Sequence, residues 1–193
     1  MPFLDTPISG LFVFEPKVFE DSRGYFMETF NEKVFAEKNI NTNFVQDNQS
    51  KSSYGVLRGL HYQLNPFAQA KLVRVISGEV LDVAVDIRKG SPTYGQHFSI
   101  VLSAENKKQL YIPRGFAHGF VVLSETAEFF YKCDNFYSKE HDAGIIYNDK
   151  DLHIDWKVPA AKLIISDKDK NLLSLENALN NFEFDGSVYI DIE

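Results

Sequence analysis

Arg58 and His61 stand three residues apart in an otherwise apolar stretch, and together they could take a proton from a negatively charged ligand. The ordinary pKa of histidine lies near neutral pH, so His61 can act as a base. Residues 56–63 have the composition of a strand, in which side chains three apart face opposite ways. A bulge at Gly59 would bring both to one face. Taken alone, His61 would more often be a core histidine bonded to a backbone carbonyl.

Two further basic residues, Lys71 and Arg74, follow on the next predicted strand. Each of these cations, taken alone, fits a solvated strand edge. Together with Arg58 and His61 they predict a pocket that binds an anion, because guanidinium and ammonium groups suit phosphate oxygens. The chain carries 20 basic and 27 acidic residues, a net charge of −7, so a local cluster must hold such an anion.

A Pro-x-Gly-x-x-His segment, residues 113–118, resembles the second signature of the cupin barrel, where the histidine is often a metal ligand. The first signature normally supplies His-x-His and a nearby glutamate, because a divalent cation needs at least three converging ligands. Here a tyrosine and a glutamine follow His61, and the next carboxylate, Glu79, lies well downstream. The sequence therefore predicts a cupin-like barrel without a metal, in which His118 either packs at a turn or contacts a polar ligand.

Two tyrosines and an acidic segment add groups that could transfer protons. A phenol in a pocket can donate a proton and its ring can stack on a planar ligand, and periodicity does not separate these roles for Tyr131 and Tyr137. Asp167 and Asp169 flank Lys168. A carboxylate from this segment could stabilise a protonated imidazole, or it could lie in a solvated turn or helix cap.

Period-two alternation of apolar residues recurs along the chain and predicts many short strands. The expected strands cover residues 73–75, 80–87, 98–102, 109–112, 119–123 and 128–132, with polar turns between them. Residues 21–28 read as a loop that leads into a strand, residues 46–51 as a loop, and residues 32–38 as a helix capped by Asn31. These elements predict an all-β fold, a cupin-like jelly-roll barrel with a few short peripheral helices. Such a barrel can enclose a ligand pocket.

The chain changes character after Ser166. A polar approach and five apolar residues predict a helix over residues 172–179, and alternation over residues 187–192 predicts a final strand. We expect one domain, residues 1–175, and an extension, residues 176–193, for which the sequence indicates no role.

Composition narrows the class of protein. The net charge of −7 argues against a nucleic-acid partner. Cys133 is the only cysteine, which excludes an internal disulfide framework and a multi-cysteine metal site. No apolar run reaches membrane-spanning length, and no basic region precedes an apolar core at the N-terminus. We expect a soluble, cytoplasmic protein that does not bind a membrane.

Several of these segments, in the same order, resemble the dTDP-4-dehydrorhamnose 3,5-epimerase family, the third enzyme of dTDP-L-rhamnose synthesis. The matching segments are residues 21–26, 44–48, 56–61, 71–74, 78–80, 82–88, 112–113, 115–120 and 131–132. The resemblance covers about the first 170 residues. The tail from Glu176 runs beyond it, and Phe136 stands where many relatives carry a more polar aromatic residue.

The resemblance implies a reaction and a catalytic set. The reaction is epimerisation of dTDP-4-dehydro-6-deoxy-D-glucose at C3 and C5, which gives dTDP-4-dehydro-L-rhamnose and needs neither a cofactor nor a metal. The resemblance makes His61 the general base, Tyr131 the acid on the opposite face, and Lys71 the cation at the enolate oxygen. Asp169 becomes the carboxylate partner of the base, in preference to Asp167, because the family register places that carboxylate directly after a lysine.

The resemblance also implies a substrate-binding set and a homodimer, in which N-terminal strands could be exchanged. Arg23, Arg58 and Lys168 would hold the nucleotide and its diphosphate. Tyr137 would stack on the thymine ring. Polar contacts would come from Glu28, Gln46, Asp47, Asn48, His118 and Asp142.

Other functions stay open on the sequence. Relatives that epimerise only C3, or isomerise a related dTDP-4-keto-6-deoxy sugar, share most of these motifs. A metal-dependent cupin oxygenase would bind a divalent ion. A non-catalytic module would bind dTDP without proton exchange, and the joint presence of His61, Lys71 and Tyr131 speaks against it.

Overall fold

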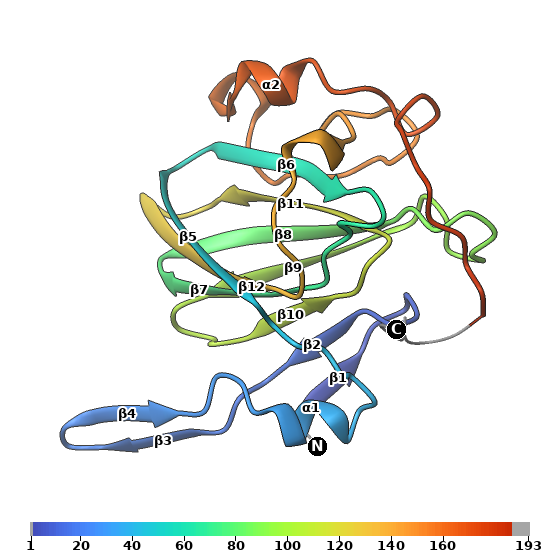
Figure 1. Cartoon of the computed structure of the whole chain (residues 1–193). Coiled ribbons are helices and arrows are strands. Elements are labelled where there is room, and N and C mark those ends of the chain that lie inside the picture. The colour runs from blue at the N-terminus through green and yellow to red at the C-terminus, as the bar shows by residue number, and fades with distance from the viewer. Residues whose placement is uncertain (1, 187–193) are drawn as a thin grey trace.

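Two antiparallel sheets face each other and enclose much of the apolar core in this computed structural model, which describes residues 2–186 (Figure 1). The first sheet has the order β1 (Phe3–Asp5), β2 (Phe12–Phe14), β10 (Gln109–Ile112), β7 (Lys71–Ser77), β12 (Thr126–Cys133) and β5 (Gln46–Ser53). The second has the order β13 (Asp142–Gly144), β6 (Val56–Gln63), β11 (Phe116–Val122), β8 (Glu79–Asp86) and β9 (His97–Ser103), and β14 (Ile164–Ile165) pairs with β6. The predicted all-β jelly-roll barrel is confirmed.

The helices are short and peripheral, as predicted. They are α1 (Glu32–Ala36), α2 (Asp167–Lys170) and the 3-10 turns η1 (Lys139–His141) and η2 (Ala160–Lys162). Asn31 caps α1, because its side-chain oxygen accepts a hydrogen bond from the Lys33 backbone N–H at 3.0 Å. Within residues 2–186, no helix is both long and apolar enough to cross a membrane.

The six strands expected from alternation all form, as β7 to β12, but one polar segment that was predicted as a loop is also a strand. Residues 46–51 belong to β5, the edge strand of the first sheet. Its inward side chains are polar because they border a cavity, so the apolar alternation that marks a strand is missing. Residues 21–28, predicted as a loop that leads into a strand, contain the turn and the second strand of a hairpin, β3 (Val18–Asp21) and β4 (Gly24–Met27), which projects from the barrel (Figure 1).

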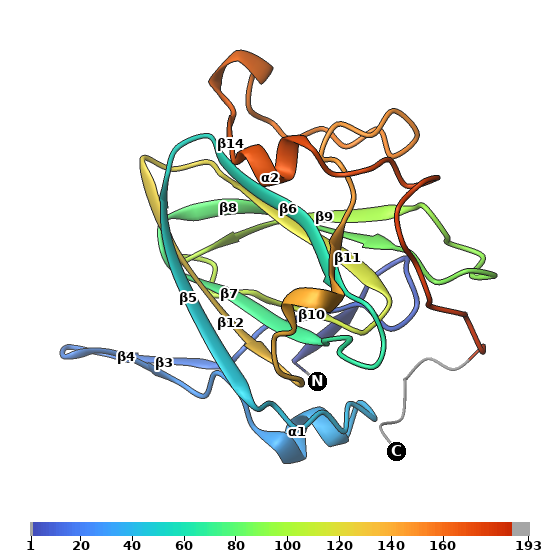
Figure 2. The same cartoon turned by 45° about the horizontal axis from the view of Figure 1, so that its top comes forward.

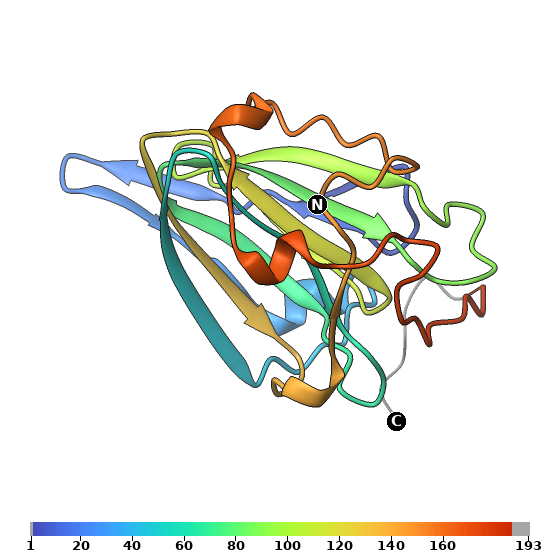
Figure 3. The ribbon, with the colours of Figure 1, turned by 90° about the horizontal axis from the view of Figure 1, so that it is seen from above.

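The predicted helix over residues 172–179 is wrong. Only α2 is helical in this region, and residues 172–186 instead run back along the outside of the second sheet (Figure 3). A single turn closes within the segment, where Ala178 N donates to Ser174 O at 2.8 Å, but other backbone groups bond to neighbouring loops. Ile146 N donates to Leu173 O at 2.8 Å, and Leu175 N donates to Asp149 Oδ2 at 2.7 Å. We call residues 172–186 the C-terminal strap. The strand predicted over residues 187–192 lies outside the described residues.

Apolar side chains fill three layers. Val73, Leu110 and Phe129 belong to the layer between the two sheets. A second layer covers the outer face of the second sheet, where loops and the C-terminal strap lie over β6, β8 and β11. A third surrounds α1. Because both faces of the second sheet are covered, seven of the eight residues of β8 are buried.

Candidate active site

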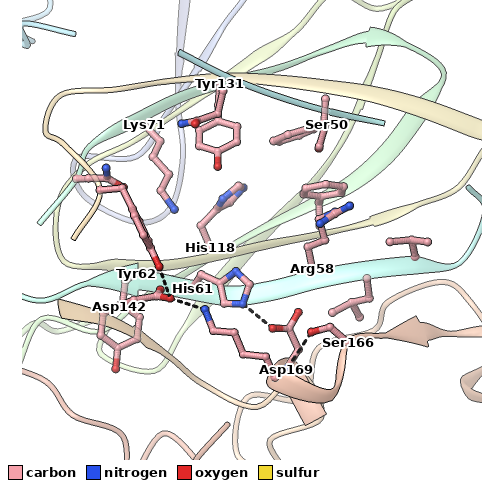
Figure 4. A pocket seen from close by; sticks show the side chains of 18 of the residues that line it. Ser50, Arg58, His61, Tyr62, Lys71, His118, Tyr131, Asp142, Ser166 and Asp169 are labelled. Carbon is pink, nitrogen blue, oxygen red and sulfur yellow. Dashed lines mark hydrogen bonds and ion pairs between the residues drawn. The ribbon is translucent and has the colours of Figure 1, made fainter. Parts of the chain in front are cut away.

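A cavity of about 680 Å³ opens between the sheets, a size that suits a small ligand (Figure 4). Its walls come from β5, β6, β7, β11 and β12, and from the segment that includes β14 and α2, which lies beside β6 (Figure 2). Of the predicted site residues, ten line it: Asn48, Arg58, His61, Lys71, His118, Tyr131, Tyr137, Asp142, Lys168 and Asp169.

His61 and Asp169 form a hydrogen-bonded pair, although they are far apart in the sequence. His61 Nε2 lies 2.7 Å from Asp169 Oδ1, and Asp169 is 3% exposed. Burial by itself raises the pKa of Asp169, but the bonds from His61, the Gly59 N–H and Ser166 outweigh it and hold that pKa below its usual value. The carboxylate therefore accepts the Nε2 proton, and Nδ1 of His61 faces the cavity (Figure 4).

The structure decides between the two candidate aspartates. Asp167 is exposed and pairs with Lys170 at 3.3 Å, whereas the N-cap residue Ser166 accepts a hydrogen bond from Asp169 N at 3.1 Å. One turn of helix thus directs Asp169, rather than Asp167, toward His61.

A bulge in β6 brings Arg58 and His61 to the same cavity. His118 of β11 pairs with His61, and Phe120, two residues later, pairs with Arg58, three residues before His61. The additional residue lies at Gly59–Leu60, as the sequence predicted. Gly59 has φ +136°, and a Cβ there would lie 2.5 Å from the Gly119 Cα. No other residue therefore fits at this point, where β6 lies against β11.

Lys71 and Tyr131 stand on the opposite wall, on neighbouring strands of the first sheet (Figure 4). Lys71 Nζ lies 6.0 Å from the centre of the Tyr131 ring. Burial lowers the pKa of Lys71 and raises the pKa of Tyr131 to about 12. The phenol is thus protonated at neutral pH, and the ammonium sits in a poorly hydrated place where a nearby negative charge would be strongly favoured.

Sequence reasoning missed Asp82, which holds His118. Asp82 is fully buried, and its Oδ2 lies 2.9 Å from His118 Nε2. Burial, with smaller contributions from Lys71 and His61, lowers the pKa of His118 despite this carboxylate. A charged residue within the apolar run of β8 was the available signal, because a buried carboxylate needs a partner.

At the cavity mouth, Lys168 forms an ion pair with Asp142, and Tyr137 Oη donates to the same Asp142 carboxylate at 3.2 Å. Tyr137 is 56% exposed, and its ring offers a flat face to a ligand. Arg58 donates from Nε and Nη2 to Ser52 Oγ at 3.3 and 3.2 Å. Within residues 2–186, Arg58 forms no ion pair with a carboxylate, so its charge is available to an anion.

Gln46 supports the mouth from behind. It does not line the cavity, but its Nε2 donates to Asn48 Oδ1 at 3.1 Å and its Oε1 accepts from Tyr137 N at 3.1 Å.

Two residues expected at the site lie on the outer face of the first sheet. Asp47 pairs there with Lys132 at 3.0 Å, and Arg74 lies over the Phe130 ring at 5.3 Å. Strand alternation explains both positions: β7 turns Lys71 inward and therefore Arg74 outward, and β5 turns Asn48 inward and Asp47 outward. The expectation that Arg74 joins the anion-binding cluster is wrong.

Arg23 and Glu28 are also remote from the cavity of their own chain. Arg23, in the β3–β4 turn, pairs with Asp21 at 2.6 Å. Glu28 follows β4 and accepts from Asn31 Nδ2 at 2.9 Å.

Within residues 2–186, no three His, Cys, Asp or Glu side chains come together as metal ligands would.

A family model described as dTDP-4-dehydrorhamnose 3,5-epimerase matches residues 5–177. The chain belongs to this family. A dTDP-4-dehydrorhamnose 3,5-epimerase of Shigella flexneri is 59% identical over 172 residues, which are 89% of this chain and 94% of that protein.

Solved structures of epimerases are similar over most of the chain. A dTDP-6-deoxy-D-glucose-3,5-epimerase of Legionella pneumophila Philadelphia 1, in complex with dTDP-4-keto-L-rhamnose, is 49% identical with a TM-score of 0.87, over 91% of this chain and 93% of that chain. A 3′-monoepimerase of Streptomyces bikiniensis, in complex with dTDP-quinovose, is 32% identical with a TM-score of 0.81, over 89% and 86%. The expected cupin-like jelly roll is thus the fold of this epimerase family.

Proposed function

We infer that the chain is an isomerase that epimerises dTDP-4-dehydro-6-deoxy-D-glucose at C3 and C5 to dTDP-4-dehydro-L-rhamnose. One observation carries the inference: the His61–Asp169 pair faces Tyr131 and Lys71 across a single cavity. A base on one wall, and an acid and a cation on the other, are the groups that inversion next to a ketone requires.

The C4 ketone acidifies the hydrogens on C3 and C5. His61 Nδ1 takes the C3 proton, and the electron pair of the broken C–H bond moves to O4 as an enolate. Lys71 stabilises the negative oxygen, and loss of such a preorganised donor costs about 3 kcal/mol or more. Tyr131 returns a proton to the opposite face of C3. After His61 has passed its proton to solvent and the Tyr131 phenolate has taken one up, the sequence repeats at C5. Asp169 stabilises the imidazolium meanwhile.

Each step moves only protons and one electron pair, so the reaction requires no redox partner. The Lys71 ammonium supplies the positive charge at O4, so the enolate needs no metal ion to stabilise it.

The rest of the cavity fits a nucleoside diphosphate. We propose that Arg58 and Lys168 bind the diphosphate oxygens, with polar help from Asn48, Gln46 and His118. Tyr137 would stack on thymine, and Asp142 would release Lys168 to the phosphate while keeping its bond to the tyrosine. Asp47 is a weaker candidate, because its carboxylate faces away from the cavity.

Arg23 and Glu28 suggest a homodimer, since the β3–β4 hairpin carries them away from the barrel. Phe19 and Phe26 of this hairpin are 53% and 69% exposed, an apolar surface that a second copy could cover while delivering Arg23 to the neighbouring cavity. Light scattering should give twice the chain mass, and a monomeric mass at assay concentration would refute the dimer.

We also propose a cytoplasmic location, in keeping with a single, buried, unpaired cysteine.

The test of the base is His61→Ala. We expect loss of solvent-proton exchange at C3 with dTDP affinity within about twofold of the natural protein, because the imidazole contacts the sugar and not the nucleotide. Retained exchange would place the base elsewhere.

A second candidate is epimerisation at C3 alone, which the similarity to the Streptomyces bikiniensis 3′-monoepimerase favours. In deuterated water, label at both C3 and C5 supports the first function, and label at C3 alone supports the second.

A further inference from the structure

The C-terminal strap runs along the outside of the second sheet (Figure 3), and its outer half is anchored to the loops that follow β6 and β8. Asn181 exchanges three hydrogen bonds with Asn65, and Asn180 Nδ2 donates to Ile87 O at 2.5 Å. Farther on, Lys89 N donates to Phe182 O at 3.0 Å, and Phe184 N donates to Lys89 O at 2.8 Å. The family model ends at residue 177, so the outer half of the strap lies beyond it.

The strap reaches the strand of the base at three consecutive positions, at the first two through the residues that pair with β6 and at the third directly. The first position is Leu60. Leu60 exchanges backbone hydrogen bonds of 2.9 and 3.1 Å with Ile145, and Ile145 forms a parallel bridge with Leu173 of the strap.

The second position is His61 itself, whose partner on β13 is Gly144. Leu172 of the strap lies so close to Gly144 that a Cβ there would come within 2.8 Å of the leucine Cδ1. Leu172 therefore fits against the backbone that pairs with the base.

The third position is Tyr62. Its hydroxyl donates to Leu179 O at 2.5 Å, and its ring meets Phe182 edge-on at 6.3 Å between ring centres. Phe182 is 4% exposed. Burial raises the pKa of Tyr62 to about 12, so the hydroxyl stays a donor throughout the pH range of an assay.

The same strap begins two residues after α2, the helix that carries Asp169. It is thus covalently joined to one member of the His61–Asp169 pair and packed against the strand of the other. We propose that the C-terminal strap positions Asp169 against His61, with Tyr62 and Phe182 as the positioning residues that set its place on β6. This inference rests on the proposed function for its kinetic consequence, but not for its structural one.

The test uses Phe182→Ala and the milder Tyr62→Phe in the full chain, each with and without Asp169→Asn. We expect Phe182→Ala to lower kcat for exchange at C3 about tenfold and Tyr62→Phe about threefold, with KM and dTDP affinity within about twofold, because a misplacement below 1 Å slows proton transfer without changing nucleotide contacts. In the Asp169→Asn background neither change should lower kcat further, since the pair they position is already broken.

Leu152→Ala is the matched control. Leu152 is 3% exposed in the same apolar layer but belongs to the loop before η2 rather than to the strap. Its loss should lower the melting temperature as Phe182→Ala does and leave kcat within about twofold at a temperature where both variants are folded.

A spectroscopic readout separates this inference from the reaction. The His61 Nε2 proton bonded to a carboxylate should give a low-field proton resonance, absent in Asp169→Asn and broadened or lost in Phe182→Ala. An unchanged resonance in Phe182→Ala, or a tenfold loss of kcat that repeats in the Asp169→Asn background, would overturn the positioning role. If the natural protein showed no exchange at all, the proposed function would fail and the resonance alone would decide on the strap.

Discussion

Replacing Asp169 by asparagine keeps the shape of the side chain and removes its charge, so it isolates what the carboxylate does for His61. Each carboxylate oxygen has a donor: Oδ1 faces His61 Nε2 at 2.7 Å, and Oδ2 accepts from Gly59 N at 3.3 Å. Asparagine has only one acceptor oxygen. If that oxygen keeps the Gly59 bond, its NH₂ group faces Nε2 and favours the tautomer that carries the proton on Nδ1, the nitrogen that should act as base.

Two effects contribute to the expected loss of kcat in Asp169→Asn. A hydrogen bond to a charged group is worth about 1.5–3 kcal/mol, which is about 10- to 150-fold in rate at 1.36 kcal/mol per factor of ten. An inverted tautomer adds to this, and in Ser-His-Asp triads the same substitution costs about 10⁴-fold. We therefore expect Asp169→Asn to lower kcat for exchange at C3 by about 10²- to 10⁴-fold, with little change in dTDP affinity.

The assay follows deuterium incorporation at C3 by NMR, with dTDP binding measured by calorimetry on the same samples. Asp167→Asn is the control, because Asp167 lies in the same helix, is exposed and pairs with Lys170. It should stay within about twofold of the natural rate. An Asp169→Asn variant that exchanged C3 at the natural rate would refute the reasoning.

Other variants test the remaining roles. Tyr131→Phe should lower product formation about 100-fold while His61 still washes deuterium into C3, because only the second proton donor is lost; equal loss of both would contradict a separate acid. Since burial raises the pKa of Tyr131 to about 12, product formation should not fall on its account as pH rises toward that value. Lys71→Met should slow exchange about 10²- to 10³-fold with unchanged dTDP affinity, and a loss of affinity alone would assign it to nucleotide binding. Asn48→Ala should weaken dTDP binding about fivefold as a direct polar contact is lost. Asp47→Ala should leave dTDP affinity within twofold in calorimetric titrations. A larger loss of affinity in Asp47→Ala than in Asn48→Ala would show that β5 turns Asp47, and not Asn48, toward the cavity.

The part of the site that could be predicted from sequence lies on regular strands. The apolar run around His61 and the glycine before it specify both a strand and its bulge, and the bulge puts Arg58 and the base in one cavity. Alternation likewise fixes Lys71 on the inner face of β7, yet the same rule, applied to Arg74, shows that it must point outward.

The parts that could not be predicted depend on contacts between distant segments. Residues 172–179 have helix-like spacing, but their backbone groups and leucines are used by the loop after β13 and by β6, which no local pattern reveals. β5 reads as a loop because its inner face serves a polar cavity instead of the core. The role of Asp82 could not be predicted, because its partner His118 comes beside it only through the pairing of β8 with β11.

Deuterium incorporation by the natural protein tests the central claim most directly. Incubated in deuterated water with dTDP-4-dehydro-6-deoxy-D-glucose, the protein should place deuterium at both C3 and C5 and yield the L-rhamno configuration, without any added cofactor. Absence of label at both carbons, with substrate bound, would contradict proton transfer by His61 and Tyr131 and with it the account of the site.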